Sequence, residues 1–395
     1  MFRRAPHAPT SHRLAHPTST ASTTRLPYLV AAVTGRALAA SAIRGGHRVV
    51  VLDCFADRDT AALARACRSV VAPTRLRIDR VALLKAAADL APVERCAGVV
   101  YGSGFEGRTA LLASLGQGRR ICGNPPSVVD EVREPGRFFG LLDRLAIPHP
   151  EVRTTVPPSP SGWLLKRAGG AGGAQVRPAS GGPAPAGGYF QRLESGRVLS
   201  ALFLADGHRA RILGINQQWT SGARPRLPFL YGGAVGGFVL PRSVRSDVAA
   251  RVDALVAATG LVGLNGIDFL LRGAEWSLLE LNPRPTATAE LYDRDYPRGL
   301  FDWHLRACEG QLPARPARPR ATRAHAVVHA ATAGRVSRRF DFPAWCRDVP
   351  RPGTTYFPGD PLCTVHAAAR TARAALALLG RRKRRLEETL LEAVS

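Results

Sequence analysis

The sequence predicts an α/β fold that begins with a parallel, Rossmann-like sheet. Two apolar, strand-like runs, "LPYLVAAV" (26–33) and "HRVVVLDCF" (47–55), flank a helical pattern at 34–46, and another strand follows at 96–104. Strands that alternate with helices favour a parallel sheet. Such sheets bind ligands beyond the carboxyl ends of their strands. The loop "YGSGFEGR" (101–108) follows one such end and is a candidate binding loop, with an ordinary turn before a helix as the alternative.

Composition narrows the class of protein. The 395 residues are 45% hydrophobic and 22% charged, which predicts a globular chain of two or three domains. The net charge of +25 raises the question of a nucleic-acid partner. However, the arginines are spread along the chain and are not interleaved with aromatic residues, so no nucleic-acid partner is expected.

Membrane insertion and disulfide bonding are also not expected. No run has the length and apolarity of a membrane helix, and the seven scattered cysteines form no CxxC pair. This predicts reduced thiols in a cytoplasmic protein rather than disulfides or a zinc site. Residues 1–25 are rich in His, Pro, Ser, Thr and Arg, which predicts a disordered tail. The oligomeric state stays open, a homo-oligomer being one alternative.

A dinucleotide site is the first functional alternative, because Gly35 opens the first strand-to-helix turn and Asp53 ends the second strand. The turn "TGRALAAS" lacks the second and third glycines of the GxGxxG pattern, which a pyrophosphate needs for close backbone approach. NAD or FAD binding is therefore not expected.

A lysine and a glycine-rich loop follow a predicted strand in "GWLLKRAGGAGGAQV" (162–176). Lys166 is the only lysine between residues 86 and 382 in a chain that otherwise uses arginine. An ammonium on a flexible stem suits phosphate oxygens, and glycines let backbone N–H groups close over phosphates. The four glycines concerned are Gly169, Gly170, Gly172 and Gly173. A plain hairpin turn is the alternative.

"GLVGLNGIDFLLRGAEWSLLELNPRP" (260–285) predicts a β-hairpin that turns about residues 272–276. Folding this hairpin places Asp268 opposite Glu280, and Asn282, two residues further on, shares the face of Glu280. Hard oxygen donors of this kind suit Mg²⁺ whose shell is completed by phosphate oxygens. Arg284, just beyond this strand, could supply the positive charge that a reacting anion needs. The alternative for any one of these residues is a hydrogen-bonded polar side chain at a sheet edge.

The order of these pieces resembles the ATP-grasp superfamily over about residues 26 to 380, with "ELNPR" as its most specific element. The resemblance implies that Lys166 contacts the phosphates of ATP, that the glycine loop is the phosphate lid, and that Asp268, Glu280 and Asn282 bind Mg²⁺. It also implies that Arg284 steadies an acyl phosphate. Finally, it implies that Gln191, Arg192 and Leu193 form the hinge that offers backbone groups to adenine.

The resemblance implies an ATP-grasp fold with a Rossmann-like N-terminal domain and a small β-rich C-terminal piece. The expected parts are a pre-ATP-grasp domain at 26–122, the ATP-grasp domain at 123–310 with a flap subdomain at about 153–206, and a C-terminal piece with a terminal helix at 311–395. Many members carry a phosphate-contacting lysine in the segment that enters the ATP-grasp domain, and here Arg137 lies nearest that place.

The implied activity is that of a ligase joining a small-molecule carboxylate to an amine, with ATP and Mg²⁺. More narrowly, "YGSGFE", "GWLLKRAGGAGG" and "ELNPRPTAT" resemble ATP-grasp proteins linked to tetrahydromethanopterin and methanofuran one-carbon metabolism. The alternative is a non-catalytic nucleotide-binding protein on a degenerate ATP-grasp scaffold.

Overall fold

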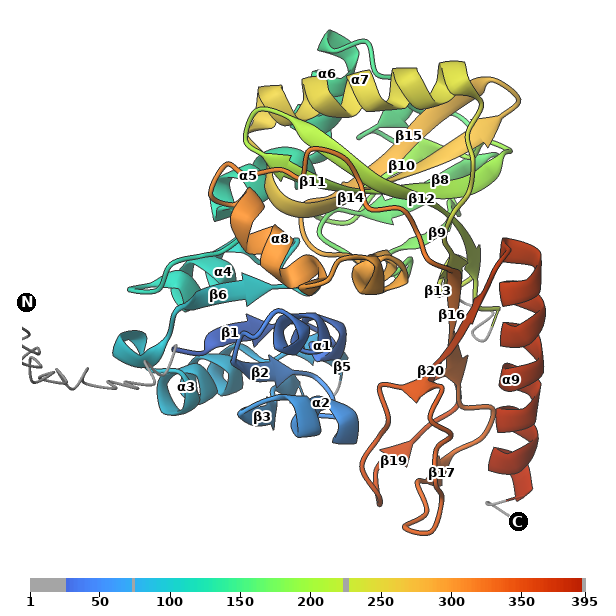
Figure 1. Cartoon of the computed structure of the whole chain (residues 1–395). Helices are drawn as coiled ribbons and strands as arrows, with labels where there is room; N and C mark the ends of the chain where they lie inside the picture. The colour runs from blue at the N-terminus through green and yellow to red at the C-terminus, as the bar shows by residue number, and fades with distance from the viewer. Residues whose placement is uncertain (1–25, 73–74, 223–226, 393–395) are drawn as a thin grey trace, which may run out of the picture.

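The computed structural model describes residues 26–72, 75–222 and 227–392. The predicted disordered tail, 1–25, lies outside the described residues. An N-terminal α/β part lies below a large twisted sheet, and the last strands and helix of the chain stand beside both (Figure 1). None of the described helices combines the length and apolarity needed to cross a membrane.

The N-terminal part is the predicted parallel sheet, with strand order β3-β2-β1-β6. The strands β1, β2 and β6 are almost wholly buried, which explains why they are continuous apolar runs, whereas the edge strand β3 is partly exposed. The elements are β1 (Tyr28–Ala31), α1 (Arg36–Arg44), β2 (Val49–Asp53), α2 (Arg58–Leu63), β3 (Ala66–Ser69), the hairpin β4 (Val71–Ala72) and β5 (Arg75–Ile78), α3 (Arg80–Leu90), η1 (Val93–Arg95), β6 (Gly98–Tyr101) and α4 (Thr109–Gly116).

Two helices, α5 (Pro126–Arg133) and α6 (Pro135–Arg144), lead into a small antiparallel sheet. The strand order is β7-β10-β8-β9, and the strands are β7 (Val152–Arg153), β8 (Trp163–Arg167), β9 (Val176–Pro178) and β10 (Gly188–Arg192). Gln191 and Arg192 of the expected hinge therefore lie on β10, which pairs with the strand that carries Lys166.

The large sheet has eight antiparallel strands in the order β15-β14-β11-β12-β13-β16-β20-β18. The strands are β11 (Arg197–Asp206), β12 (Ala210–Thr220), β13 (Tyr231–Val235), β14 (Val262–Arg272), β15 (Glu275–Asn282), β16 (Thr322–His329), β18 (Cys346–Arg347) and β20 (Pro361–Ala369), with a separate pair β17 (Gly334–Arg335) and β19 (Thr355–Tyr356). Because β11 pairs with β14 here, the small sheet ends at Arg192 rather than extending to 206. The C-terminal piece is β-rich and ends in a helix, as expected, and its strand β16 pairs with β13 and so continues the large sheet.

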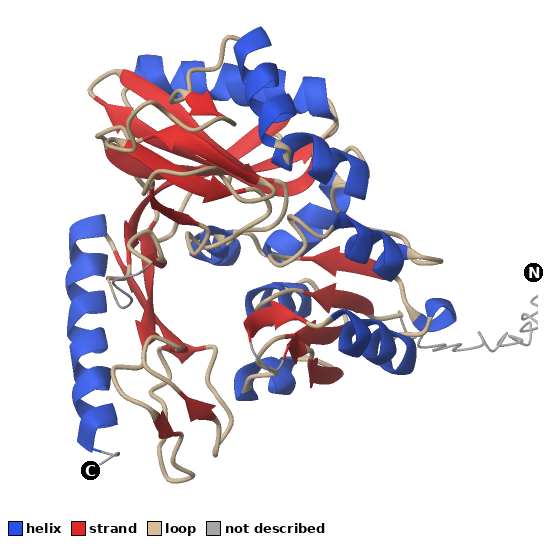
Figure 2. Ribbon diagram, turned by 180° about the vertical axis from the view of Figure 1, so that it is seen from behind, coloured by secondary structure: helices blue, strands red, loops and turns tan. Residues whose placement is uncertain are grey.

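Helices cover the two faces of the large sheet unequally (Figure 2). The long helix α7 (Arg242–Thr259) packs Val248 and Leu255 onto Phe203 and Phe269. On the opposite face, α8 (Gly299–Ala307) and the short helices η2 (Ala287–Leu291) and η3 (Asp293–Asp295) cover one end. The C-terminal helix α9 (Ala372–Glu392) packs on β16 and β20 against Ala324 and Val365, which the strand register places on the same face as α7. The strands of β11 and β14 therefore have an apolar side under α7 and a second side that holds the polar residues described below.

We expect Phe269→Ala to lower the free energy of unfolding by about 3–5 kcal/mol, because it leaves a cavity in the core beneath α7. Phe269 is fully buried, whereas Phe357 is 61% exposed. Phe357→Ala is therefore the matched control and should change the free energy by less than about 0.5 kcal/mol. Urea unfolding followed by tryptophan fluorescence measures both, and equal effects would contradict this assignment of the core.

Candidate active site

Two carboxylates face each other across the β14–β15 hairpin. Asp268 pairs directly with Glu280, as predicted, and the two side chains are hydrogen-bonded to each other. The amide of Gln218 donates to Asp268 Oδ1 over 2.8 Å, and that of Asn282 donates to Oδ2 over 3.0 Å. The hairpin register therefore brings all three predicted metal-binding residues together on the face away from α7.

The two carboxylates differ in their affinity for a proton. Burial, followed by the charge of Glu280, raises the pKa of Asp268 to about 7. Burial acts in the same direction on Glu280, but the charges of Arg133 and Lys166 outweigh it and lower the pKa of Glu280. The two carboxylates thus repel each other at a position where a cation would relieve that repulsion.

This donor set fits Mg²⁺, because it consists of hard oxygen atoms with a surplus of negative charge. Among the residues that the structure describes, no three His, Cys, Asp or Glu side chains converge as a metal site. The protein would supply the two carboxylates together with Asn282. In the structure the amide nitrogen of Asn282 faces Asp268 and its oxygen faces Arg284, so ligation by Asn282 requires its amide to turn over.

Arg284 links the metal-binding strand to the N-terminal part. Its Nε donates to the carboxylate of Glu106, which is 3% exposed, and its Nη2 donates to Asn282 Oδ1 over 3.2 Å. Burial would raise the pKa of Glu106, but Arg284 and Arg133 outweigh it and lower the pKa. The predicted binding loop 101–108 is therefore joined to "ELNPR" through Glu106, a residue that the sequence analysis did not single out.

Lys166 is buried on β8, and its Nζ donates to Gln191 Oε1 over 2.8 Å. Gln191 in turn donates to the carbonyl of Leu279 over 3.4 Å. Leu279 is the extra residue of a β-bulge that follows the Asp268–Glu280 pair, so its carbonyl is free to accept this bond. The side chain of Gln191 thus positions the lysine beside the carboxylates.

The other two residues of the predicted hinge lie at the surface. The guanidinium of Arg192 lies 5.5 Å from the ring centroid of Trp163. Leu193 is 51% exposed, and its backbone N–H donates to Gly162 O over 2.8 Å. The adenine-binding role of Gln191, Arg192 and Leu193 stays a prediction.

The glycine loop is held against two other segments. A Cβ on Gly169 would lie 2.3 Å from Gly107 Cα, and one on Gly173 would lie 1.8 Å from Phe229 O. Gly169, Gly172 and Gly173 also have φ values of +76°, +65° and +77°, which disfavour any side chain. Gly169 and Gly173 therefore require glycine. The loop connects β8 to β9, which pair antiparallel, so it is a hairpin connection, and its role as a phosphate lid stays a prediction. Gly170 lies over the side chain of Gln175.

Arg133, at the end of α5, is the guanidinium that reaches this site. It donates to Gly170 O over 2.8 Å and to Leu281 O over 3.1 Å, and it lies 3.9 Å from Glu280 Oε2. Its Nε is buried and has no hydrogen-bond partner among the described residues. Arg137, which the sequence places nearest the phosphate-contacting lysine of related proteins, is exposed and pairs with Glu131 and Glu134. Nothing in an arginine-rich sequence distinguishes Arg133 in advance.

A sequence model of the ATP-grasp domain matches residues 138–288, which include Lys166, the glycine loop and the carboxylate pair. The chain contains an ATP-grasp domain. A comparison of the sequence with curated proteins finds no match.

Solved structures extend the ATP-grasp fold to almost the whole chain. The biotin carboxylase domain of Hydrogenobacter thermophilus 2-oxoglutarate carboxylase, in complex with MgADP, ADP and bicarbonate, superposes with a TM-score of 0.69 at 11% identity and covers 90% of this chain and 89% of its own. N5-carboxyaminoimidazole ribonucleotide synthetase from Thermotoga maritima has a TM-score of 0.64 at 14% identity, with coverages of 91% and 98%. Rhizobium etli pyruvate carboxylase has a TM-score of 0.68 at 13% identity and covers 91% of this chain, which spans 37% of that longer chain.

We expect Glu106→Gln to lower the free energy of unfolding by about 3–5 kcal/mol near neutral pH, because it leaves Arg284 buried without its counter-ion. The folded-state pKa of Glu106 is lowered, so its stabilising contribution is present above the unfolded pKa and is lost as the pH falls below it. Urea unfolding should therefore show that the difference between the two proteins shrinks below about pH 4.5.

The control for this prediction is Glu275→Gln, since Glu275 and its partner Arg272 are 76% and 71% exposed. It should change the free energy by less than about 0.5 kcal/mol at either pH. A gap between wild type and Glu106→Gln that stays constant on acidification would contradict the ion-pair assignment.

Proposed function

We propose that the protein is an ATP-dependent ligase that joins a carboxylate to an amine through an acyl phosphate. The observation that carries this proposal is the half-buried Asp268–Glu280 pair, which lies near Lys166 and near a glycine loop in which Gly169 and Gly173 leave no room for a side chain. Cations, backbone N–H groups and metal-binding oxygens gathered in this way support binding of a triphosphate.

Three groups of residues would bind the phosphates of the nucleotide, and each supplies a different kind of contact. Lys166, held by Gln191, and Arg133, held by two backbone carbonyls, supply positive charge to the phosphates. The loop from Gly169 to Gly173 supplies backbone N–H groups. Mg²⁺ bound to Asp268, Glu280 and Asn282 would neutralise charge that develops on the transferred phosphoryl group.

The reaction proceeds in two steps. The substrate carboxylate attacks the γ-phosphate and ADP leaves; the amine then attacks the acyl carbon and phosphate leaves. Arg284 would stabilise negative charge on the acyl phosphate, since its hydrogen bonds to Glu106, Asn282 and the carbonyl of Pro285 use three of its five N–H bonds. The MgADP and bicarbonate named for one structural relative support a nucleotide and a small carboxylate-type anion as ligands here.

The carboxylate and amine are not identified by this site. A role in methanopterin or methanofuran synthesis rests on the sequence resemblance alone, and the comparisons do not support it. A cytoplasmic location likewise stays an expectation from the composition.

The first test is ADP release from Mg·ATP across a panel of carboxylates, including bicarbonate, and of amines, including glutamate and tyramine. We expect release to require both a carboxylate and an amine. Lys166→Ala should lower the rate at least about tenfold, since a charged contact to phosphate contributes about 1.5–3 kcal/mol. Glu280→Ala should abolish turnover while circular dichroism shows a folded protein.

Two outcomes would contradict this proposal. ATP binding without ADP release on any pair of substrates would favour the non-catalytic nucleotide-binding alternative. Turnover at the wild-type rate in folded Glu280→Ala would contradict the metal assignment.

Arg133→Ala should raise KM for Mg·ATP by about 10–100-fold, because it removes a buried cation from beside the phosphates. Arg133→Lys should recover part of this loss. The matched control is Arg137→Ala, since Arg137 is exposed and pairs only at the surface, and its KM should stay within about twofold of wild type. A larger effect of Arg137 than of Arg133 on steady-state ADP release would contradict this assignment.

A further inference from the structure

An open pocket of about 420 Å³ lies where three segments of the chain meet. Arg44 comes from the end of α1, and Arg320 comes from the segment that enters β16. The third segment, which contains η3 and the turn after it, contributes Arg294, Tyr296 and Pro297. None of these residues takes part in the nucleotide site proposed above, so the pocket is a second, separate concavity.

The carboxylate nearest Arg44 is buried and already bonded. Asp293 is 6% exposed and accepts hydrogen bonds from the Ser41 hydroxyl and, over 2.7 Å, from the Leu300 N–H. Its Oδ2 also lies 2.7 Å from Arg44 Nη1. Asp293 therefore compensates the charge of Arg44 and holds this guanidinium at the wall of the pocket.

The next carboxylate along η3 is also fully engaged. Asp295 accepts two hydrogen bonds from the guanidinium of Arg323, over 2.8 and 3.0 Å. It accepts a third from the backbone N–H of Arg320, over 3.0 Å. This last bond fixes the backbone of Arg320 at the pocket but leaves its guanidinium without a counter-ion.

Two of the three lining arginines are uncompensated. The side chains of Arg294 and Arg320 are exposed, and neither forms an ion pair or a side-chain hydrogen bond with the part of the chain that the structure describes. The lining has three guanidinium groups and no carboxylate, and only Arg44 has a counter-ion beside it. A concave surface with one sign of charge concentrates ligands of the opposite sign.

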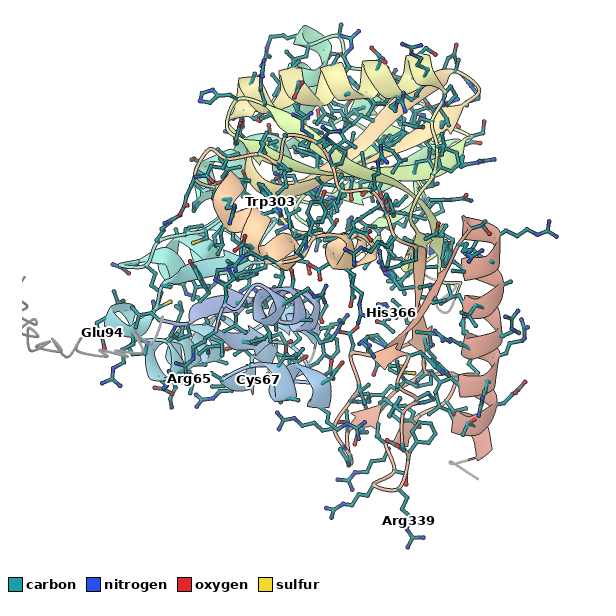
Figure 3. All side chains as sticks on the ribbon, in the orientation of Figure 1. Arg65, Cys67, Glu94, Trp303, Arg339 and His366 are labelled. Carbon is teal, nitrogen blue, oxygen red and sulfur yellow. The ribbon has the colours of Figure 1, made fainter. Side chains whose placement is uncertain are left out.

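The floor of the pocket is held rigidly. Tyr296 is 5% exposed, and its hydroxyl accepts a hydrogen bond from the Ala317 N–H over 3.2 Å. It belongs to a core cluster with Leu300, and Trp303 of α8, labelled in Figure 3, packs against the same cluster. Because the backbone around the arginines is already fixed, a ligand has to order only their side chains.

The lining indicates the chemistry of the ligand. The volume is that of a small-molecule site, for which about 300–1,000 Å³ is typical, but only Tyr296 and Pro297 offer apolar surface. A guanidinium forms paired hydrogen bonds with phosphate oxygens. A phosphate monoester carries about two negative charges at neutral pH, which matches the two uncompensated arginines. A nucleic-acid backbone would instead need a cationic groove that follows it.

We propose that this pocket binds a small phosphate-bearing molecule, with Arg294 and Arg320 contacting the phosphate and Arg44 as the third guanidinium. The inference does not depend on the proposed ligase function. A bound anion would join the end of α1 to the segments on either side of α8. Since it would bind the folded protein only, it should also stabilise the protein against thermal unfolding.

The first test locates the site on the full-length protein. Phenylglyoxal modifies accessible arginine side chains, and mass spectrometry gives the rate at each one. We expect inorganic pyrophosphate to slow the modification of Arg294 and Arg320 at least fivefold. The internal control is Arg245, which is exposed on α7 at the other face of the large sheet, and its rate should not change.

The second test measures affinity by titration calorimetry with pyrophosphate. Arg294→Ala and Arg320→Ala should each weaken binding at this site about tenfold or more, because each removes charged hydrogen bonds to phosphate. Arg294→Lys should recover part of the loss, and Arg320→Glu should abolish binding there. Arg245→Ala removes the same charge elsewhere and should leave the affinity within about twofold of wild type. Circular dichroism checks that each variant is folded.

The outcomes are distinct. Unchanged modification rates at Arg294 and Arg320 in saturating pyrophosphate overturn the site. An equal loss of affinity in Arg245→Ala shows attraction to the net charge of the chain alone, and also overturns it. Malonate that binds as tightly as pyrophosphate at equal ionic strength overturns the phosphate class. Because no measurement here records turnover, failure of the ligase proposal would leave these results unchanged.

Discussion

The register of the β14–β15 hairpin is the constraint on which the site depends. Asp268 and Glu280 lie opposite each other on one face, while Phe269 and Leu281 pack under α7 on the other. A slip by one residue would exchange the two faces and bury a carboxylate among apolar side chains. Burial of Phe269 and Leu281 in the core therefore fixes the pairing of β14 with β15. That pairing in turn places Asp268 opposite Glu280. The bulge at Leu279 extends this control, because its carbonyl positions Gln191 and through it Lys166.

Buried ion pairs then attach other parts of the chain to this hairpin. The Arg284–Glu106 pair joins it to the N-terminal part, and the Arg36–Glu290 pair joins the first helix to the segment after β15. Such pairs contribute little net stability, since desolvation offsets the Coulomb attraction. Their effect is on position, because an unpaired partner would be a buried charge. The three parts are thus held at the relative positions that the site requires.

The sequence predicted those features that depend on neighbours along the chain. Asp268 and Glu280 belong to a single hairpin, so strand period and turn position suffice to pair them. Glu106 and Arg284 are 178 residues apart, and Arg36 and Glu290 are 254 apart. No local pattern relates such positions, and arginine is too common here to mark Arg133. The C-terminal strands were expected as a separate piece because pairing between β13 and β16 also depends on tertiary contacts.

Tyr231 on β13 connects the glycine loop to the C-terminal strand β16. Its backbone N–H donates to Gly172 O over 2.9 Å, and its hydroxyl contacts His325. Arg133 holds the same loop through Gly170 O. Two hydrogen bonds thus hold the glycine loop, one from α5 and one from the large sheet. Because Arg133 also lies 3.9 Å from Glu280, the residue that fixes the loop is the same one that lowers the pKa of the metal-binding carboxylate. The position of the loop and the charge of the carboxylate pair therefore depend on a single guanidinium.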